Sequence, residues 1–320
     1  MVDRIERGLS TLRGDRSTAL DACSVPRADR AQARRLQSLK HESPGRPPNR
    51  GSSVGRTTFS RLPGYAHVVD TPYQPLLNSK VRRRIFFERS NRLMQLKIAS
   101  YNIRKAVGRD LRRDPARILK VIDLIDADVV VLQEVDRRTG PRPTAIPRSL
   151  IESRTDYQVA GLARNDVSLG WHGNAILVRR GIEITSSRHI ELPGLEPRGA
   201  VLVGLGPLSI VGTHLGLLRL WRHRQMRAIL SHVGPDTHST VIAGDFNEWS
   251  DVRGCEPWDK DFTVLYPGRS FPTLRPVASL DGIAHGADIA VSSHGVMRSS
   301  PASIASDHFP IWADIALARR

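Results

Sequence analysis

The chain has 320 residues, of which 40% are hydrophobic and 5% aromatic, a composition typical of a globular protein with one large or two modest domains. No run of about 18 apolar residues occurs, which excludes a membrane-spanning helix, and the start lacks the pattern of a signal peptide. The two cysteines, Cys23 and Cys255, provide neither a disulfide framework nor a paired metal-ligand spacing. We therefore expect a monomeric protein of a reducing compartment, the cytoplasm.

Most of the net charge of +16 lies in the first part of the chain. Residues 1–93 carry 19 Lys or Arg and 8 Asp or Glu, a balance of +11. This part is rich in Pro, Gly, Ser and Arg and has little apolar periodicity, so we predict a disordered basic extension. Such an arm could bind nucleic acid. Alternatively, translation starts at Met94, because the segment MQLKIASYN begins a strand at once.

From Met94 onward, apolar patterns predict many strands and few helices. A helix is predicted over 114–127, where one face is formed by Ile118, Val121, Ile122 and Ile125. A second, basic helix is predicted over 219–233. Many strands with few helices between them indicate an α/β sandwich and not a doubly wound sheet. The predicted strands cover residues 96–103, 128–135, 172–181, 183–192, 199–215, 239–247, 286–293 and 309–317.

Several of these strands end on polar residues that a core would not select. Each residue alone has an ordinary explanation, such as a turn cap or a hydrogen-bonded histidine, but together they indicate one functional site. The residues at or near strand ends are Asn102, Glu134, His214, Asp245 and Asn247, with Asp307 and His308 just before the last strand.

This set combines carboxylates, amides and imidazoles. Carboxylate and Asn oxygens suit a hard cation such as Mg²⁺ or Mn²⁺, whereas no His-x-x-x-His or paired-Cys spacing favours zinc. A hard cation beside imidazoles and amides suits phosphate-ester cleavage. Because residues two apart share one face of a strand, Asp245 and Asn247 are predicted to point at one phosphate while Phe246 packs into the core.

Six motifs carry a family resemblance: ASYNIRKAVG, VVLQEVD, GTHLGL, AGDFNEW, SLDGI and SDHFPI. Their order and approximate spacing resemble those of the endonuclease/exonuclease/phosphatase superfamily, the deoxyribonuclease-I-like metal-dependent phosphoesterases, and most closely its small bacterial members. The resemblance covers residues 96–317. It implies a catalytic domain over residues 94–320, folded as a four-layered α/β/β/α sandwich of two mainly antiparallel sheets. The chain carries Arg104 where relatives often have His, and Ala106 where they have Gly.

The resemblance also implies roles for the residues at the strand ends. Glu134 is the principal metal ligand, with Asn102 beside it, and Asp307 is a further carboxylate near the metal. Asp245 is the base or the orienting group for the attacking water, and Asn247 donates to the phosphate.

The remaining implied roles concern the phosphate and the substrate. His308 acts on the phosphate with its orientation set by Asp281, and His214 stabilises charge in the transition state. Candidate substrate-binding residues are Asn174 and Arg198, which lie at positions that resemble family elements, and Arg104, which stands where relatives often have His.

The expected function is divalent-metal-dependent hydrolysis of a phosphodiester or phosphomonoester, by in-line attack of water. The substrate is nucleic acid, or a phospholipid or small phosphoester. No aromatic wedge for opening a duplex is evident, and the arginines of the 219–233 helix spread over more than one face, as solvated charges do. The arginines of the 219–233 helix are Arg219, Arg222, Arg224 and Arg227.

The alternative function is nucleic-acid binding through the basic arm by a protein with an inactive catalytic domain.

Overall fold

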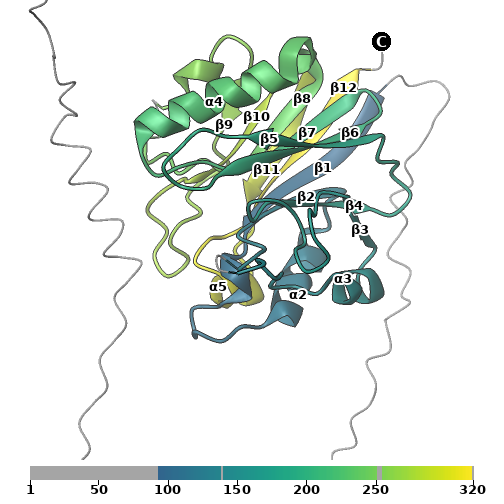
Figure 1. Ribbon diagram of the computed structural model, residues 1–320, viewed down its shortest axis with the longest axis vertical. Helices are drawn as coiled ribbons and strands as arrows, with labels where there is room; N and C mark the ends of the chain where they lie inside the picture. Colours follow the sequence, from purple (N-terminus) through teal and green to yellow (C-terminus); the bar gives the residue numbers. More distant parts are fainter. Residues whose placement is uncertain (1–92, 138–139, 251–253, 319–320) are drawn as a thin grey trace, which may run out of the picture. The chain divides into compact units, whose positions relative to one another are not determined.

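The computed structural model of the chain describes residues 93–137, 140–250 and 254–318, which are drawn in colour in Figure 1. The predicted disordered extension lies outside the described residues except for Leu93, and so does the arm invoked for nucleic-acid binding. None of the described helices combines the length and the apolar character needed to cross a membrane.

The first sheet contains β1 (Leu93–Asn102), β2 (Val129–Gln133), β3 (Tyr157–Val159), β4 (Ala175–Arg179), β11 (Ile289–Val296) and β12 (Ile311–Ala318). Their spatial order is β11–β12–β1–β2–β4–β3. Every neighbouring pair is antiparallel except β1 and β2, which are parallel.

The second sheet contains β5 (Ser186–Glu191), β6 (Gly199–Leu205), β7 (Leu208–His214), β8 (Thr240–Asp245), β9 (Thr263–Leu265) and β10 (Asp281–His285). Their order is β5–β6–β7–β8–β10–β9, and only β7 and β8 are parallel. The segment predicted as one strand over 199–215 forms the β6–β7 hairpin, because Gly206 adopts a φ of 67° at the turn.

The parallel pair at the centre of each sheet determines where the polar strand ends meet. Pairing of β1 with β2 places Asn102 opposite Gln133, the residue before Glu134. Pairing of β7 with β8 places His214 opposite Asp245. Because parallel strands end at the same edge of a sheet, each sheet brings two polar termini together.

The two predicted helices are α2 (Pro115–Ile125) and α4 (Arg219–Val233). Asp114 caps α2 by accepting a 3.0 Å hydrogen bond from the Arg117 N–H, and Pro115 occupies the first turn. The predicted apolar face of α2 is buried, which confirms the helical pattern. Shorter elements that no apolar pattern predicted are α3 (Arg148–Arg154), α5 (Ser300–Ala305), η1 (Arg104–Ala106), η2 (Gly234–Ser239) and η3 (Glu256–Trp258).

Three apolar clusters separate four layers and confirm the predicted α/β/β/α sandwich. One cluster, which includes Ile122, packs α2, α3 and α5 against the first sheet. The second lies between the sheets and includes Val131 and Val241, and the third packs Ile242 of β8 against Met226 of α4. Successive β8 residues therefore face opposite layers, as strand geometry requires. Figure 1 shows α4 on one side of the sandwich and α2, α3 and α5 on the other.

Candidate active site

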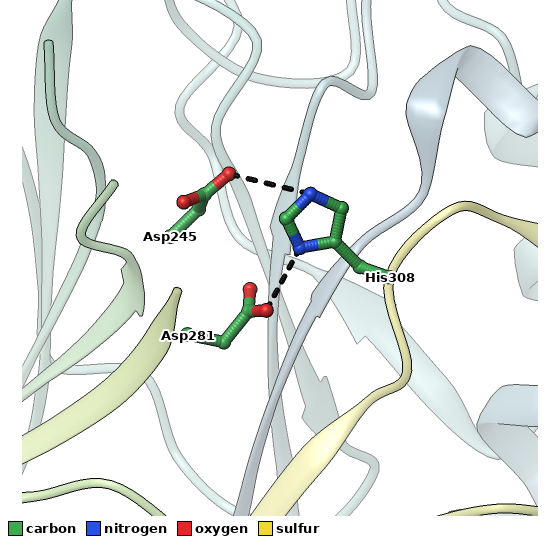
Figure 2. Close-up of side chains that lie close together, drawn as sticks. All are labelled: Asp245, Asp281 and His308. Carbon is green, nitrogen blue, oxygen red and sulfur yellow. Dashed lines mark hydrogen bonds and ion pairs between the residues drawn. The ribbon is translucent and has the colours of Figure 1, made fainter. Parts of the chain in front are cut away.

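His308 lies between two aspartates at the edge where the strands end (Figure 2). Its Nδ1 lies 2.8 Å from Asp281 Oδ2, and its Nε2 lies 3.8 Å from Asp245 Oδ2. Asp281 and Asp245 are direct partners in the antiparallel register of β10 and β8. The Ser270 hydroxyl donates a 2.5 Å hydrogen bond to Asp281 Oδ2 and holds that carboxylate in place. We refer to Asp245, Asp281 and His308, all buried, as the aspartate–histidine cluster.

Asp245 receives contacts from both sheets. Asn102 Nδ2, at the end of β1, donates to Asp245 Oδ2 at 3.0 Å, and His214 Nε2, at the end of β7, lies 3.3 Å from the same oxygen. The Asn247 backbone N–H donates to Asp245 Oδ1 at 3.0 Å. The two hydrogen bonds, from the Asn102 side chain and the Asn247 backbone, favour the charged carboxylate. The contacts also bring together predicted metal-binding and catalytic residues from three chain segments.

Burial and charge act in opposite directions on His308. Burial lowers the pKa of its imidazole, but the carboxylates of Asp281 and Asp245 outweigh burial and raise the pKa to about 10. His308 therefore carries a proton on each ring nitrogen at neutral pH. An imidazolium of this kind can donate a proton from Nε2, whereas metal ligation would require a free lone pair on the ring.

Glu134 lies immediately after β2 in the left-handed region, with a φ of 55°. Its carboxylate forms an ion pair with the Lys105 ammonium group. Asp307 forms a similar pair, in which Arg104 Nε lies 3.4 Å from Asp307 Oδ2. Each of the two carboxylates predicted to bind metal is therefore accompanied by a cation from the chain itself.

The aspartate–histidine cluster brings possible metal ligands together, and the residues implied as metal ligands by the family resemblance offer a second choice. The ligand atoms of the aspartate–histidine cluster lie within 4.8 Å of one another, but the raised pKa of His308 means that a metal ion bound there would have to displace its proton. The second group, Glu134, Asp307 and Asn102, offers only oxygen atoms, which hard divalent cations prefer. Asn102 Oδ1 accepts one 3.1 Å hydrogen bond, from the Arg104 N–H, and an amide oxygen has two acceptor sites. The second group thus fits a hard cation, and the cluster fits proton transfer.

Asn247 does not lie on a strand, so the prediction based on strand alternation was wrong at this residue. β8 ends at Asp245, and Asn247 adopts a φ of 51°, which Asn tolerates better than most residues. The cause is a turn in which the Asp245 side chain accepts from the backbone two residues later. Asn247 Nδ2 donates to the Leu215 carbonyl at 2.8 Å and ties the loop after β7 to the site. Phe246 is buried against Trp258, as predicted.

The three candidate substrate-binding residues occupy different environments. Asn174 is buried and donates from Nδ2 to the Gly199 carbonyl at 2.9 Å, while its Oδ1 has no hydrogen-bond partner among the described residues. Arg198 binds Glu196 at 2.7 Å, two positions away in its own loop. Arg104 faces the site through Asp307. Asn174 and Arg104 therefore remain candidates for substrate contacts, and Arg198 is engaged locally.

The sequence did not predict two ion pairs. One joins Lys105 to Glu134, and the other, which is buried, joins Arg222 of α4 to Glu248. Arg222, expected in solvent, lies 2.5 Å from Glu248 through Nη2 and Oε2, with side chains only 6% and 8% exposed. Glu248 Oε1 also accepts from the next two backbone N–H groups, so this pair holds the turn that follows Asn247. The available signal was Glu248 itself, a carboxylate inside the AGDFNEW motif.

Comparison with known proteins identifies the family to which the chain belongs. A model described as the Endonuclease/Exonuclease/phosphatase family matches residues 99–308. The uncharacterized protein YbhP of Escherichia coli strain K12 is 29% identical over 244 residues, which cover 69% of this chain and 96% of YbhP.

Two solved structures share the fold. The mannosyl-6-phosphatase of Bacteroides thetaiotaomicron superposes with a TM-score of 0.53 at 16% identity, covering 69% of this chain and 99% of its own. D. rerio TDP2, in complex with a single-strand DNA product, has a TM-score of 0.52 at 17% identity, covering 69% and 98%. Fold and site thus define a four-layered α/β/β/α sandwich protein with a carboxylate-rich site at its strand ends. The chain belongs to the Endonuclease/Exonuclease/phosphatase family.

Proposed function

We propose that the chain is a hydrolase that cleaves a phosphoester with the help of a bound divalent cation, Mg²⁺ or Mn²⁺. The observation that carries the proposal is the protonated His308 held between Asp281 and Asp245. Asn102, one of the three residues proposed to hold the cation, donates to Asp245 beside this histidine. Membership in a family of phosphoesterases supports the same reaction class.

In this proposal, the aspartate–histidine cluster handles the protons. Asp245 accepts a hydrogen bond from the attacking water and orients it toward phosphorus. His308 donates from Nε2 to a phosphate oxygen, and Asp281 fixes the ring through Nδ1 and stabilises its charge. The arrangement separates a negatively charged acceptor from a positively charged donor within one buried site.

Charge that develops on the phosphate is offset by the surrounding groups. Asn247 and His214 lie against Asp245 and supply further donors for the phosphate oxygens. Glu134, Asp307 and Asn102 would hold the cation, which neutralises charge on the phosphate and on the leaving oxygen when bound. We place this activity in a monomer in the cytoplasm, and the free thiol of Cys255 fits a reducing compartment.

Nucleic acid and a phospholipid or small phosphoester are the substrate classes that fit this chemistry. One structural neighbour is named for a sugar phosphate, and the other holds a DNA product. The same phosphate-centred machinery serves both classes, so the groups around the phosphate decide between them.

The test is a panel of phosphoesters, assayed with the full chain in Mg²⁺ or Mn²⁺ and again with chelator. The panel contains abasic DNA, single-stranded DNA, phospholipids and inositol phosphates. We expect hydrolysis of at least one class, lost with chelator and in Asp245→Asn. Glu183→Gln, which changes an exposed carboxylate between β4 and β5, should retain wild-type activity. Absence of chelator-sensitive hydrolysis across the panel would refute the proposal.

A further inference from the structure

The turn that follows β1 has an unusual backbone. Arg104, Lys105 and Ala106 have φ values of 47°, 57° and 58°. Three successive non-glycine residues in the left-handed region are uncommon, and such backbone persists only where surrounding contacts hold it. Here the Lys105 N–H donates to the Glu134 carbonyl at 3.0 Å, and the Arg104 N–H donates to Asn102 Oδ1 at 3.1 Å. These two hydrogen bonds hold the turn to the end of β1, at Asn102, and to the residue after β2, Glu134.

This backbone directs two successive cationic side chains onto two carboxylates from different segments. Lys105 pairs with Glu134, and Arg104 pairs with Asp307. The Lys105 and Glu134 side chains are 22% and 12% exposed, whereas those of Arg104 and Asp307 are 35% and 29% exposed. Because charges interact more strongly where water is excluded, the Lys105–Glu134 pair is the stronger of the two.

A divalent cation and the Lys105 ammonium group compete for the Glu134 carboxylate. The two cations would repel each other at contact distance, so a metal ion that binds Glu134 would displace Lys105. Lys105 then remains at the site, because its backbone N–H is bonded to the Glu134 carbonyl. A displaced ammonium group on a partly buried stem needs another anion, and a substrate phosphate beside the metal provides one.

We propose that Lys105 is a phosphate-binding residue that pairs with Glu134 until a divalent cation binds. The inference rests on the metal-dependent hydrolysis proposed above. Without the cation, Lys105 neutralises Glu134, and with the cation it binds the substrate phosphate, with Arg104 beside it. Metal and phosphate binding are therefore coupled, and each raises the affinity for the other.

The test is calorimetric titration of the full chain with Mg²⁺, alone and in the presence of inorganic phosphate. The wild-type chain should bind Mg²⁺ about tenfold more tightly with phosphate than without it. Lys105→Met should bind Mg²⁺ alone about tenfold more tightly than wild type, because the competing ammonium group is gone. In this variant, phosphate should no longer raise the Mg²⁺ affinity.

Two further variants make the result specific. Lys120→Met removes an exposed lysine of α2 and should behave as wild type. Lys105→Arg keeps the charge and should retain the coupling, which also tests the proposal if Lys105→Met does not fold.

The outcomes separate this inference from the proposed function. Unchanged Mg²⁺ affinity and intact coupling in Lys105→Met, or loss of coupling in Lys105→Arg, would overturn the role of Lys105 alone if the wild-type chain still hydrolyses a phosphoester with Mg²⁺. A wild-type chain that neither binds Mg²⁺ nor hydrolyses any phosphoester would overturn both.

Discussion

Asp281 lies directly opposite Asp245 in the antiparallel pairing of β10 with β8, so two buried carboxylates face each other across neighbouring strands. Like charges in such positions destabilise a sheet. The His308 imidazolium lies between them and offsets the repulsion. We therefore expect His308 to stabilise this edge as well as to serve the proposed chemistry.

Replacing His308 should destabilise the protein strongly. His308→Ala leaves Asp281 and Asp245 without their shared counter-charge, and removing one partner of a buried ion pair costs about 3–5 kcal/mol in the free energy of unfolding. Urea denaturation of the metal-free full chain measures this value. His294→Ala, at an exposed position of β11, should change it by less than about 0.5 kcal/mol. Equal effects of the two substitutions would contradict the assignment.

The pKa of His308 predicts how stability depends on pH. Its pKa is about 10 in the folded protein, since Asp281 and Asp245 outweigh the opposing effect of burial, and about 6.5 in the unfolded chain. Because the folded pKa is the higher one, the stabilising contribution is fully present below about pH 6.5 and is lost as the pH rises through about 10.

Urea denaturation of wild type and His308→Gln across this range measures that contribution. The difference between their free energies of unfolding should decline toward high pH by up to about 1.4 kcal/mol per pH unit. A difference that stays constant between about pH 7 and about pH 9.5 would show that His308 does not hold its proton in the folded state.

The buried pair of Arg222 and Glu248 should couple α4 to the turn after Asn247. Arg222→Met leaves Glu248 charged and buried, and we expect a loss of about 3–5 kcal/mol in the free energy of unfolding. Adding Glu248→Gln should restore much of it, because a neutral amide needs no counter-charge. Arg227→Met, at an exposed position of the same helix, is the control and should be nearly neutral. A double variant no more stable than Arg222→Met would contradict the pairing.

Glu134→Gln should separate metal dependence from folding. The amide keeps the shape of the side chain but loses the charge that attracts a cation, so kcat/KM in Mg²⁺ should fall on the order of 10³-fold. Circular dichroism should show a retained fold, and Glu183→Gln serves again as the matched carboxylate control. Wild-type activity in Glu134→Gln would remove Glu134 from the proposed metal site.

Local patterns predicted most of the longer elements and an α/β sandwich, whereas the four-layered arrangement was implied by the family resemblance. The helix over 115–125 carries its own signals, a capping Asp114 followed by Pro115 and an apolar face. The strands β3 and β9, in contrast, have three residues each, too few for any periodicity. They form because β4 and β10 supply their hydrogen-bonding partners, and this tertiary context is absent from a sequence pattern.

The motifs indicated which residues lie close together better than how their side chains are arranged. His308, Asp281 and Asp245 come together as the motifs implied. Lys105 pairs with Glu134, which lies 29 positions away in the sequence, and this pairing depends on a left-handed backbone at residues 104–106. Such a backbone is usual for Gly, and Ala106 in this segment does not indicate it. Backbone conformation of this kind is set by contacts with neighbouring strands, so it emerges only from the folded structure.

The pairing of β1 with β12, from Leu93 opposite Ala318 to Ser100 opposite Ile311, also affects how the protein is made. During translation, β1 leaves the ribosome long before β12 does, and until then one edge of β1 has no partner. The same late segment supplies Asp307 and His308. A nascent chain therefore exposes an open strand edge on β1 and lacks an assembled site until β12 is available to pair, which makes this edge prone to aggregation before folding is complete.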